Sequence, residues 1–137
     1  MISIIIPIHN EEKYIAQCLN SLLEQLISID EYEIFCVDGM SVDKTKDTIS
    51  EYTNQNNRIS LLENDKKILS SAMNIALKVA RGDYIFMLGS HVKYGVGYIQ
   101  ECLDLMKRTS ADVVGGYVET VPGTNSEIGI AISAATT

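Results

Sequence analysis

The feature that most constrains the fold is a regular alternation of short apolar runs with longer amphipathic segments. The first apolar run, ISIIIPI, covers residues 2–8 and is rich in β-branched side chains, which is typical of a parallel strand covered on both faces. Residues 9–26 follow with Ile15, Leu19 and Leu22 at helical spacing. This order predicts right-handed crossovers and an α/β, Rossmann-like fold, with a mainly parallel sheet flanked by helices.

The same alternation continues along the chain. Further strands are predicted at 31–39, 58–64, 83–89 and 111–120, and further helices at 41–55, 70–82, 97–109 and 126–137. We expect the run at 83–89 to be the central strand. Asn10 is expected to cap the first helix, and Gly82 to end the helix before it. A chain of 137 residues is long enough for one domain with its own core, so a single α/β domain over residues 1–137 is predicted.

The charge balance argues against a nucleic-acid partner. Eighteen acidic and eleven basic side chains give a net charge of -7, without a cluster of Lys and Arg, whereas phosphate neutralisation by basic residues supplies most nucleic-acid affinity. An anionic substrate would therefore need a metal cation or backbone amides to balance its charge.

The cysteines and the ends of the chain provide evidence on the cellular location of the protein. Cys18, Cys36 and Cys102 are far apart in apolar runs, which indicates reduced, buried thiols and no zinc or disulfide framework. With no signal peptide or membrane span apparent, we expect a cytoplasmic protein.

Residues 126–137 are apolar and stop without a cap, so we expect a portion of a longer protein. The oligomeric state stays open, with homo-oligomerisation through this apolar end as one alternative.

Polar side chains gather where the predicted strands end. The segments PIHNEE (7–12), VDGMS (37–41) and LGSHVKY (88–94) should meet at one edge of the sheet, because ligands bind at the carboxyl ends of parallel strands. Asp38 directly follows a buried run, and its carboxylate could accept hydrogen bonds from a nucleobase N–H or a ribose hydroxyl. The alternative is that Asp38 caps the next helix, a role for which Asp43 competes.

The motifs SIIIPIHNEEKYIAQCLNSLLEQ, EIFCVDGMSVDKT and SSAMNIALKVARGDYIFML, in this order, closely resemble the N-terminal half of family 2 glycosyltransferases, which have the GT-A fold. The match runs from Ile2 to about Gly116. The stretch from His91 onward is most similar to bacterial members related to succinoglycan-biosynthesis glycosyltransferases. The resemblance implies an inverting, metal-assisted enzyme of polysaccharide biosynthesis. It would transfer sugar from a nucleoside-diphosphate sugar to a polysaccharide or lipid-linked acceptor. The expected location is the cytoplasm, with the inner face of the membrane as the alternative.

The resemblance also implies roles for individual residues. Pro7, His9, Asn10 and Glu11 correspond to the nucleobase and ribose pocket, although Asn10 and Glu11 also suit the start of a helix. Ser90 is a candidate hydrogen-bonding group for the nucleotide, with a role in the tight turn as the alternative.

His91 is the candidate ligand of a divalent metal, Mn²⁺ or Mg²⁺, and an imidazole suits Mn²⁺ better. The alternative is a hydrogen bond from His91 to a loop carbonyl.

The sequence departs from the family pattern at two positions. Relatives carry Asp-Ala-His or Asp-x-Asp where this chain has Gly89, Ser90 and His91, and they often carry Arg in place of Met73. In the family the catalytic base lies after the segment corresponding to 111–120, beyond residue 137, so no catalytic residue is assigned. A catalytically impaired domain that binds sugar nucleotides or acts as a scaffold is therefore the alternative function.

Overall fold

The computed structural model describes residues 1–27, 29–117, 119–122 and 126–136. The chain forms two compact units, Met1–Val96 and Gly97–Thr137. The single domain predicted for residues 1–137 stays a prediction. Within the described ranges, no helix is both long enough and apolar enough to cross a membrane.

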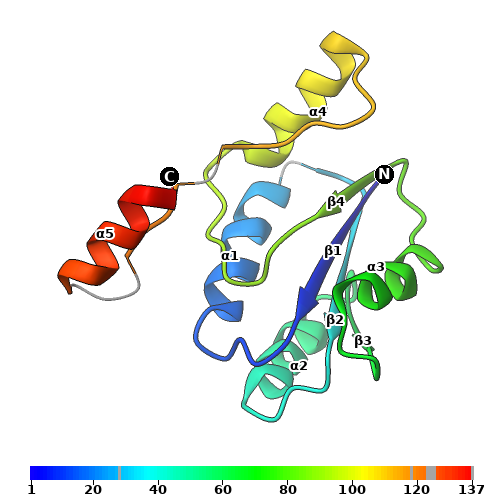
Figure 1. Ribbon diagram of the computed structural model, residues 1–137. Coiled ribbons are helices and arrows are strands. Elements are labelled where there is room, and N and C mark those ends of the chain that lie inside the picture. Colours follow the sequence, from blue (N-terminus) through cyan, green and yellow to red (C-terminus); the bar gives the residue numbers. More distant parts are fainter. Residues whose placement is uncertain (28, 118, 123–125, 137) are drawn as a thin grey trace. The chain divides into compact units, whose positions relative to one another are not determined.

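The first unit is a parallel sheet flanked by helices (Figure 1). The strands are β1 (Ile2–Ile8), β2 (Tyr32–Asp38), β3 (Ile59–Glu63) and β4 (Tyr84–Met87), in the order β3-β2-β1-β4. The helices are α1 (Ile15–Leu26), α2 (Thr45–Gln55) and α3 (Leu69–Leu77). Figure 1 shows α1 and α2 on one face of the sheet and α3 on the other. The predicted α/β, mainly parallel fold is confirmed.

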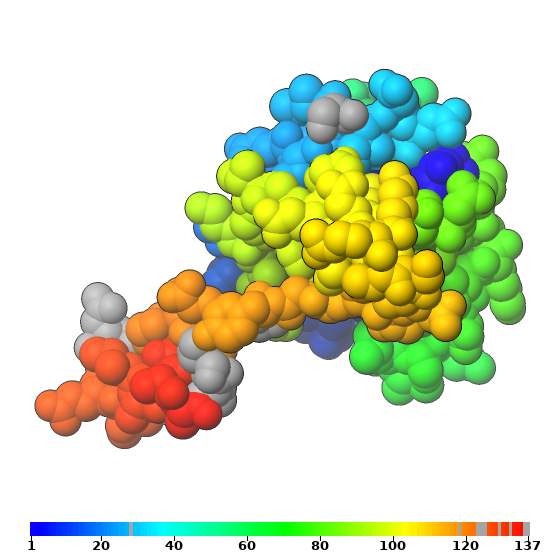
Figure 2. All heavy atoms as spheres, turned by 90° about the horizontal axis from the view of Figure 1, so that it is seen from above, coloured from blue at the N-terminus to red at the C-terminus, as the bar shows by residue number. Residues whose placement is uncertain are grey.

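β1 lies inside the sheet, which explains its continuous apolar sequence. It pairs with β2 on one side and with β4 on the other. Successive side chains of a strand point to opposite faces; Ile5, Phe35 and Val37 therefore pack with Ala72 and Ala76 on the α3 face. Figure 2 shows a small dark-blue area at the start of the chain between cyan and green atoms.

The run at 83–89 was predicted as the central strand, and this is wrong. β4 is shorter than predicted and stands last in the strand order, while β1 and β2 occupy the middle. Ile85 and Met87 are exposed, as expected of a strand at the margin of the described sheet. An apolar run indicates a strand, but the crossover connections set its place in the sheet.

Two predicted helix boundaries are also wrong. α1 begins at Ile15, after a loop in which Asn10 adopts a left-handed conformation with φ 55°, so Asn10 does not cap it. α3 ends at Leu77, five residues before Gly82. Gly82 is instead required by a close approach, because a Cβ atom there would lie 2.5 Å from the backbone nitrogen of Ser3.

The second unit contains α4 (Tyr98–Thr109) and α5 (Glu127–Thr136). α4 is flanked by two left-handed residues, Gly97 and Ser110. The strand predicted at 111–120 is not formed over the described residues 111–117 and 119–120, where Val113 and Tyr117 are exposed; residue 118 lies outside the description. β-branched composition gives a strand only when a neighbouring strand can pair with it.

Candidate functional site

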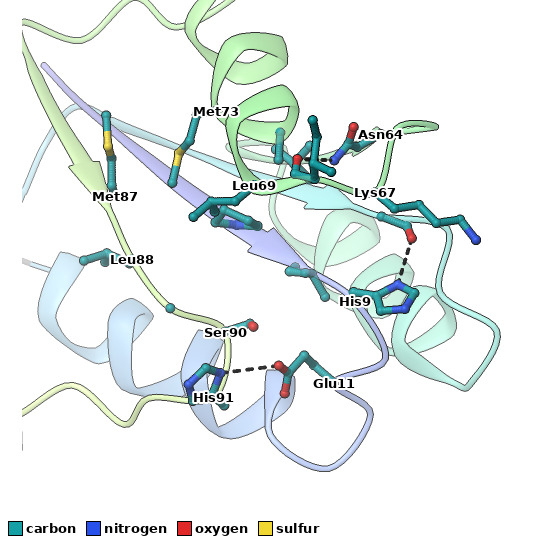
Figure 3. A pocket seen from close by; sticks show the side chains of 17 residues that line it. His9, Glu11, Asn64, Lys67, Leu69, Met73, Met87, Leu88, Ser90 and His91 are labelled. Carbon is teal, nitrogen blue, oxygen red and sulfur yellow. Dashed lines mark hydrogen bonds and ion pairs between the residues drawn. The ribbon is translucent and has the colours of Figure 1, made fainter. Parts of the chain in front are cut away.

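A pocket of about 450 Å³ opens in the first unit at the carboxyl ends of the strands. Its walls come from the loops after β1, β2 and β4, from the segment after β3, and from the start of α3 (Figure 3). Five of the seven predicted site residues line it, and they are Pro7, His9, Glu11, Ser90 and His91. The other two, Asn10 and Asp38, do not.

One wall of the pocket is apolar. Leu69 and Met73 from α3 lie opposite Met87 and Leu88 from β4 and its loop, as Figure 3 shows. Leu69 and Met87 are more than half exposed, so flat apolar surface is available to a ligand. Pockets of this kind bury the apolar body of a small molecule and orient it with a few polar groups.

His9 is held in one orientation. Its Nδ1 lies 2.8 Å from the carbonyl oxygen of Gly39. Because a carbonyl accepts only, Nδ1 donates this bond, and Nε2 is left to accept from the Asn10 side-chain amide at 3.3 Å. The His9 ring thus has a fixed tautomer and a fixed position on the pocket wall.

Asn10 connects the loop after β1 to the loop after β2. Its backbone N–H donates to Ser41 Oγ at 2.8 Å, and its side-chain oxygen accepts from the Val42 N–H at 2.9 Å. Its side chain is exposed and lies outside the pocket lining. Asn10 therefore positions the two loops, and its predicted contact with a nucleotide stays a prediction.

The same two loops are joined by further backbone bonds, and we call residues 10–12 and 41–45 together the loop clasp. The Glu11 N–H donates to the buried Thr45 Oγ1 at 2.8 Å. The Glu12 N–H donates to Asp43 Oδ2 at 3.2 Å, and Glu12 in return accepts from the Lys44 N–H at 3.0 Å. The loop clasp fixes the wall that carries His9 and Glu11.

Asp38 is fully buried and lies outside the pocket lining. Its Oδ2 accepts from the Ser41 N–H at 3.0 Å and lies 3.5 Å from Lys46 Nζ, while its buried Oδ1 has no hydrogen-bond partner among the described atoms. The neighbours Val37 and Gly39 do line the pocket. Asp38 therefore does not share the pocket lining with His91, because alternate strand residues point to opposite faces. Its predicted contact with a nucleobase or a ribose stays a prediction.

His91 and Glu11 meet across the rim of the pocket. His91 Nδ1 lies 3.4 Å from Glu11 Oε1, and Figure 3 shows the two side chains directed toward each other from separate loops. The His91 side chain is 66% exposed and that of Glu11 only 19%. The His91 imidazole is therefore open to a ligand, while the Glu11 carboxylate is largely enclosed.

Two hydrogen bonds to the Gly89 carbonyl hold the turn that carries His91. The Gly89 carbonyl accepts from the Tyr94 hydroxyl at 3.1 Å and from Cys18 Sγ at 3.5 Å. Burial, helped by the negative charge of Glu11, raises the pKa of the Cys18 thiol to about 12, so this thiol remains a protonated donor near neutral pH. Ser90 is buried on the pocket wall.

The protein alone offers few metal ligands at this turn. Among the described residues, no group of three or more His, Cys, Asp or Glu side chains could hold a metal ion. His91 and Glu11 supply one nitrogen and one carboxylate, a donor pair that suits Mn²⁺. A divalent ion here would need its other ligands from water or from the bound molecule.

Two polar residues of the pocket lining were not singled out from the sequence. Asn64 is 2% exposed; its side-chain amide donates to the Ile68 carbonyl at 3.0 Å, but its buried Oδ1 has no partner among the described atoms. Lys67 is exposed, has a left-handed backbone with φ 56°, and lines the pocket. Both follow β3, so the rule used for the other strand ends would have found them.

Comparison with known proteins gives consistent matches. A family model described as Glycosyl transferase family 2 matches residues 3–133. A curated relative from Methanococcus voltae is named dolichyl N-acetyl-alpha-D-glucosaminyl phosphate 3-beta-D-2,3-diacetamido-2,3-dideoxy-beta-D-glucuronosyltransferase. It is 34% identical over 88% of this chain, which corresponds to 40% of the relative.

Solved structures share the fold at lower identity. Staphylococcus aureus TarS 1-349 in complex with UDP-GlcNAc has a TM-score of 0.67 and 23% identity over 88% of this chain and 38% of its own. A mannosyltransferase from Pyrobaculum calidifontis in complex with GDP-Man and Mn²⁺ has a TM-score of 0.72 and 21% identity over 83% of this chain and 33% of its own. The chain thus spans 40% or less of the length of these proteins.

Proposed function

The chain belongs to glycosyl transferase family 2, and on that premise we propose that it is the donor-binding part of a glycosyltransferase that uses a nucleoside-diphosphate sugar. The observation that carries this proposal is the pocket at the carboxyl ends of the strands, where an apolar wall faces a polar rim. Complexes of the two solved neighbours with UDP-GlcNAc and GDP-Man support this class of donor.

The pocket favours one direction for the donor. Figure 3 shows Asn64, Lys67 and His9 toward one end, and Ser90, His91 and Glu11 toward the other. The nucleobase would lie against Ile68 and Leu69 and donate an N–H to Asn64 Oδ1, which has no partner among the described atoms. The diphosphate would then extend toward Ser90 and His91. Asp38, buried beneath Gly39, would support this wall through its bond from Ser41, and a direct contact with the nucleoside remains part of the proposal.

A divalent cation is part of the proposed site, because the net charge is -7 and a carboxylate stands on the rim. We propose His91 as a ligand of Mn²⁺ or Mg²⁺. The neighbour that contains Mn²⁺ supports the first of these ions. Such an ion, when bound, would offset the negative charge of the diphosphate leaving group. The residues of this chain hold and orient the donor for inverting transfer.

The pocket lining identifies neither the acceptor nor a catalytic base. The name of the Methanococcus voltae relative contains a dolichyl phosphate, which supports a lipid-linked acceptor, with a polysaccharide as the other class. We propose a cytoplasmic enzyme, which a lipid-linked acceptor would bring to the inner face of the membrane. Glu11, the carboxylate among the described lining residues, faces His91. We therefore assign no base.

Isothermal titration calorimetry of the full-length protein tests the proposal. UDP and GDP, each with and without MnCl2 or MgCl2, should include one diphosphate that binds and whose affinity rises with metal, whereas inorganic phosphate should not bind. Absence of binding by both diphosphates with both metals would refute a donor site.

A second candidate function, sugar-nucleotide binding without transfer, is favoured by Gly89, which offers no side chain at the turn before His91. A Cβ atom at this position would meet only Val92 Cγ2, at 3.2 Å, so Gly89→Asp should fold. The measurement is donor hydrolysis by the full-length protein. A large gain in Gly89→Asp supports the impaired domain, and ready turnover by the parent protein excludes it.

A further inference from the structure

We infer that Glu11 is the second protein ligand of the divalent cation, joining His91, and that it supplies from the loop after β1 a carboxylate that the turn after β4 lacks. This inference rests on the proposed function and assigns to Glu11 a role different from the nucleoside contact expected from the sequence. Gly89 and Ser90 provide no carboxylate next to His91. Glu11 reaches the same point from another element (Figure 3).

The spacing of the two ligand atoms fits one shared ion. Glu11 Oε1 and His91 Nδ1 are 3.4 Å apart. Adjacent ligands at about 2.1 Å from an octahedral ion lie about 3 Å from each other, so a small movement of the exposed His91 ring would let both atoms reach one cation. A nitrogen and a carboxylate oxygen are ligands that Mn²⁺ accepts.

Glu11 is positioned before any ligand arrives. Its N–H donates to the buried Thr45 Oγ1 at 2.8 Å, and its carbonyl accepts from the Tyr14 and Ile15 N–H groups at 3.0 and 2.9 Å. Its side chain is only 19% exposed. Because the backbone is fixed on both sides and the carboxylate is largely enclosed, little conformational freedom is lost when a ligand binds.

The charge of Glu11 explains why the pocket would need a cation. A carboxylate on the rim repels a diphosphate that extends toward Ser90 and His91. A divalent ion between the Glu11 carboxylate and the diphosphate would attract both groups and so overcome their mutual repulsion. Since the described residues provide two ligands, metal alone should bind weakly. Metal and nucleoside diphosphate should therefore strengthen each other's binding by the same factor.

The matched pair Glu11→Gln and Glu24→Gln tests the inference in the full-length protein. Glu24 is an exposed residue of α1 outside the pocket, and both substitutions remove one negative charge at nearly constant size. Calorimetry gives the affinity for UDP or GDP, whichever binds, without metal and with MnCl2. Electron paramagnetic resonance of Mn²⁺ gives direct metal binding in the presence of the nucleotide.

We expect Glu11→Gln to bind the nucleotide without metal at least as well as the parent, and to lose about tenfold or more of the enhancement by Mn²⁺. Glu24→Gln should keep the enhancement. In a double-mutant cycle, Glu11→Gln and His91→Ala should be strongly non-additive if they share one ion. Unfolding curves of each variant verify that the fold is retained, and the exposed His91 provides a variant that keeps the core intact.

An undiminished Mn²⁺ enhancement in Glu11→Gln would overturn this inference alone and leave the donor site standing. The same conclusion follows if the effects of Glu11→Gln and His91→Ala simply add. Failure of the parent protein to bind either diphosphate would instead refute the proposed function, and this inference with it.

Discussion

At the residue scale, Asn64 has the most evident unmet hydrogen-bonding requirement in the pocket. Its Oδ1 is buried without a partner among the described atoms, while its amide group is already bonded to Ile68. A buried acceptor without a donor costs about 1–3 kcal/mol, and a ligand N–H would remove that cost. Asn64 is thus suited to distinguish ligands that present a donor from those that do not.

We predict that Asn64→Leu weakens binding of the nucleoside diphosphate by about 5- to 150-fold, which corresponds to the loss of about 1–3 kcal/mol. Asn64→Asp keeps an acceptor but loses the donor to Ile68, and should retain more affinity than Asn64→Leu. Calorimetry with UDP and GDP measures both variants. If Asn64→Leu binds as the parent does, the side chain makes no contact with the ligand.

The sequence predicted those residues of the candidate site that lie at the ends of strands. Pro7, His9, Glu11, Ser90 and His91 line the pocket because parallel strands end at one edge. Asp38 also ends a strand, but its side chain points to the face of α2, and the sequence alone did not reveal which face the pocket occupies. The pairing of Glu11 with His91 could not be predicted, since it depends on the path of two loops.

At the element scale, the contact between β1 and the segment before β4 depends on Gly82. Gly82→Ala places a methyl group 2.5 Å from the Ser3 backbone nitrogen, so strand backbone has to move. We expect a loss of about 1–3 kcal/mol or more in the free energy of unfolding. Urea denaturation measures it. Gly95→Ala is the control, because a Cβ there meets nothing within 4 Å, and it should be neutral or slightly stabilising. Equal midpoints for the two variants would contradict the close approach.

The stability of the loop clasp should depend on the buried hydroxyl group of Thr45. Thr45→Val keeps the shape of Thr45 but leaves the Glu11 N–H without its acceptor, and we expect a loss of about 1–3 kcal/mol in stability. Thr45→Ser keeps the oxygen and should retain most of the stability. Amide hydrogen exchange at Glu11 should accelerate in Thr45→Val only. Unchanged exchange would mean that the other bonds of the loop clasp hold Glu11.

At the scale of the whole molecule, the sequence predicted the first unit well and the second poorly. β1 was predicted with its observed bounds, and the other strands of the sheet were found within two residues, because apolar periodicity directly reflects burial. The strand predicted at 111–120 failed because pairing depends on a partner strand. The strand order was not predicted correctly either, since it is set by the connections between strands and not by the local sequence pattern.

The end of the sheet opposite the pocket is held together by Glu33. This buried carboxylate on β2 accepts from Ser3 Oγ on β1 at 2.7 Å, from the Arg81 N–H at 2.7 Å, and from the Arg81 guanidinium at 2.9 and 3.1 Å. One side chain therefore joins β1, β2 and the segment that leads into β4. Burial acts to raise the pKa of Glu33, but these hydrogen bonds and the charge of Arg81 outweigh it and lower the pKa below its ordinary value of 4.5.

This lowered pKa makes the stabilisation by Glu33 dependent on pH. The unfolded chain binds the proton more readily than the folded one, so the contribution is complete above about pH 4.5 and is lost as the pH falls through the folded-state pKa. We predict that Glu33→Gln lowers the free energy of unfolding at pH 7 by about 1–3 kcal/mol, and that the difference from the parent shrinks steadily in more acidic solution. Urea denaturation at a series of pH values measures both, with Glu51→Gln, an exposed position on α2, as the control. A difference that persists at full size in acid would show that the stabilisation does not depend on the charge of Glu33.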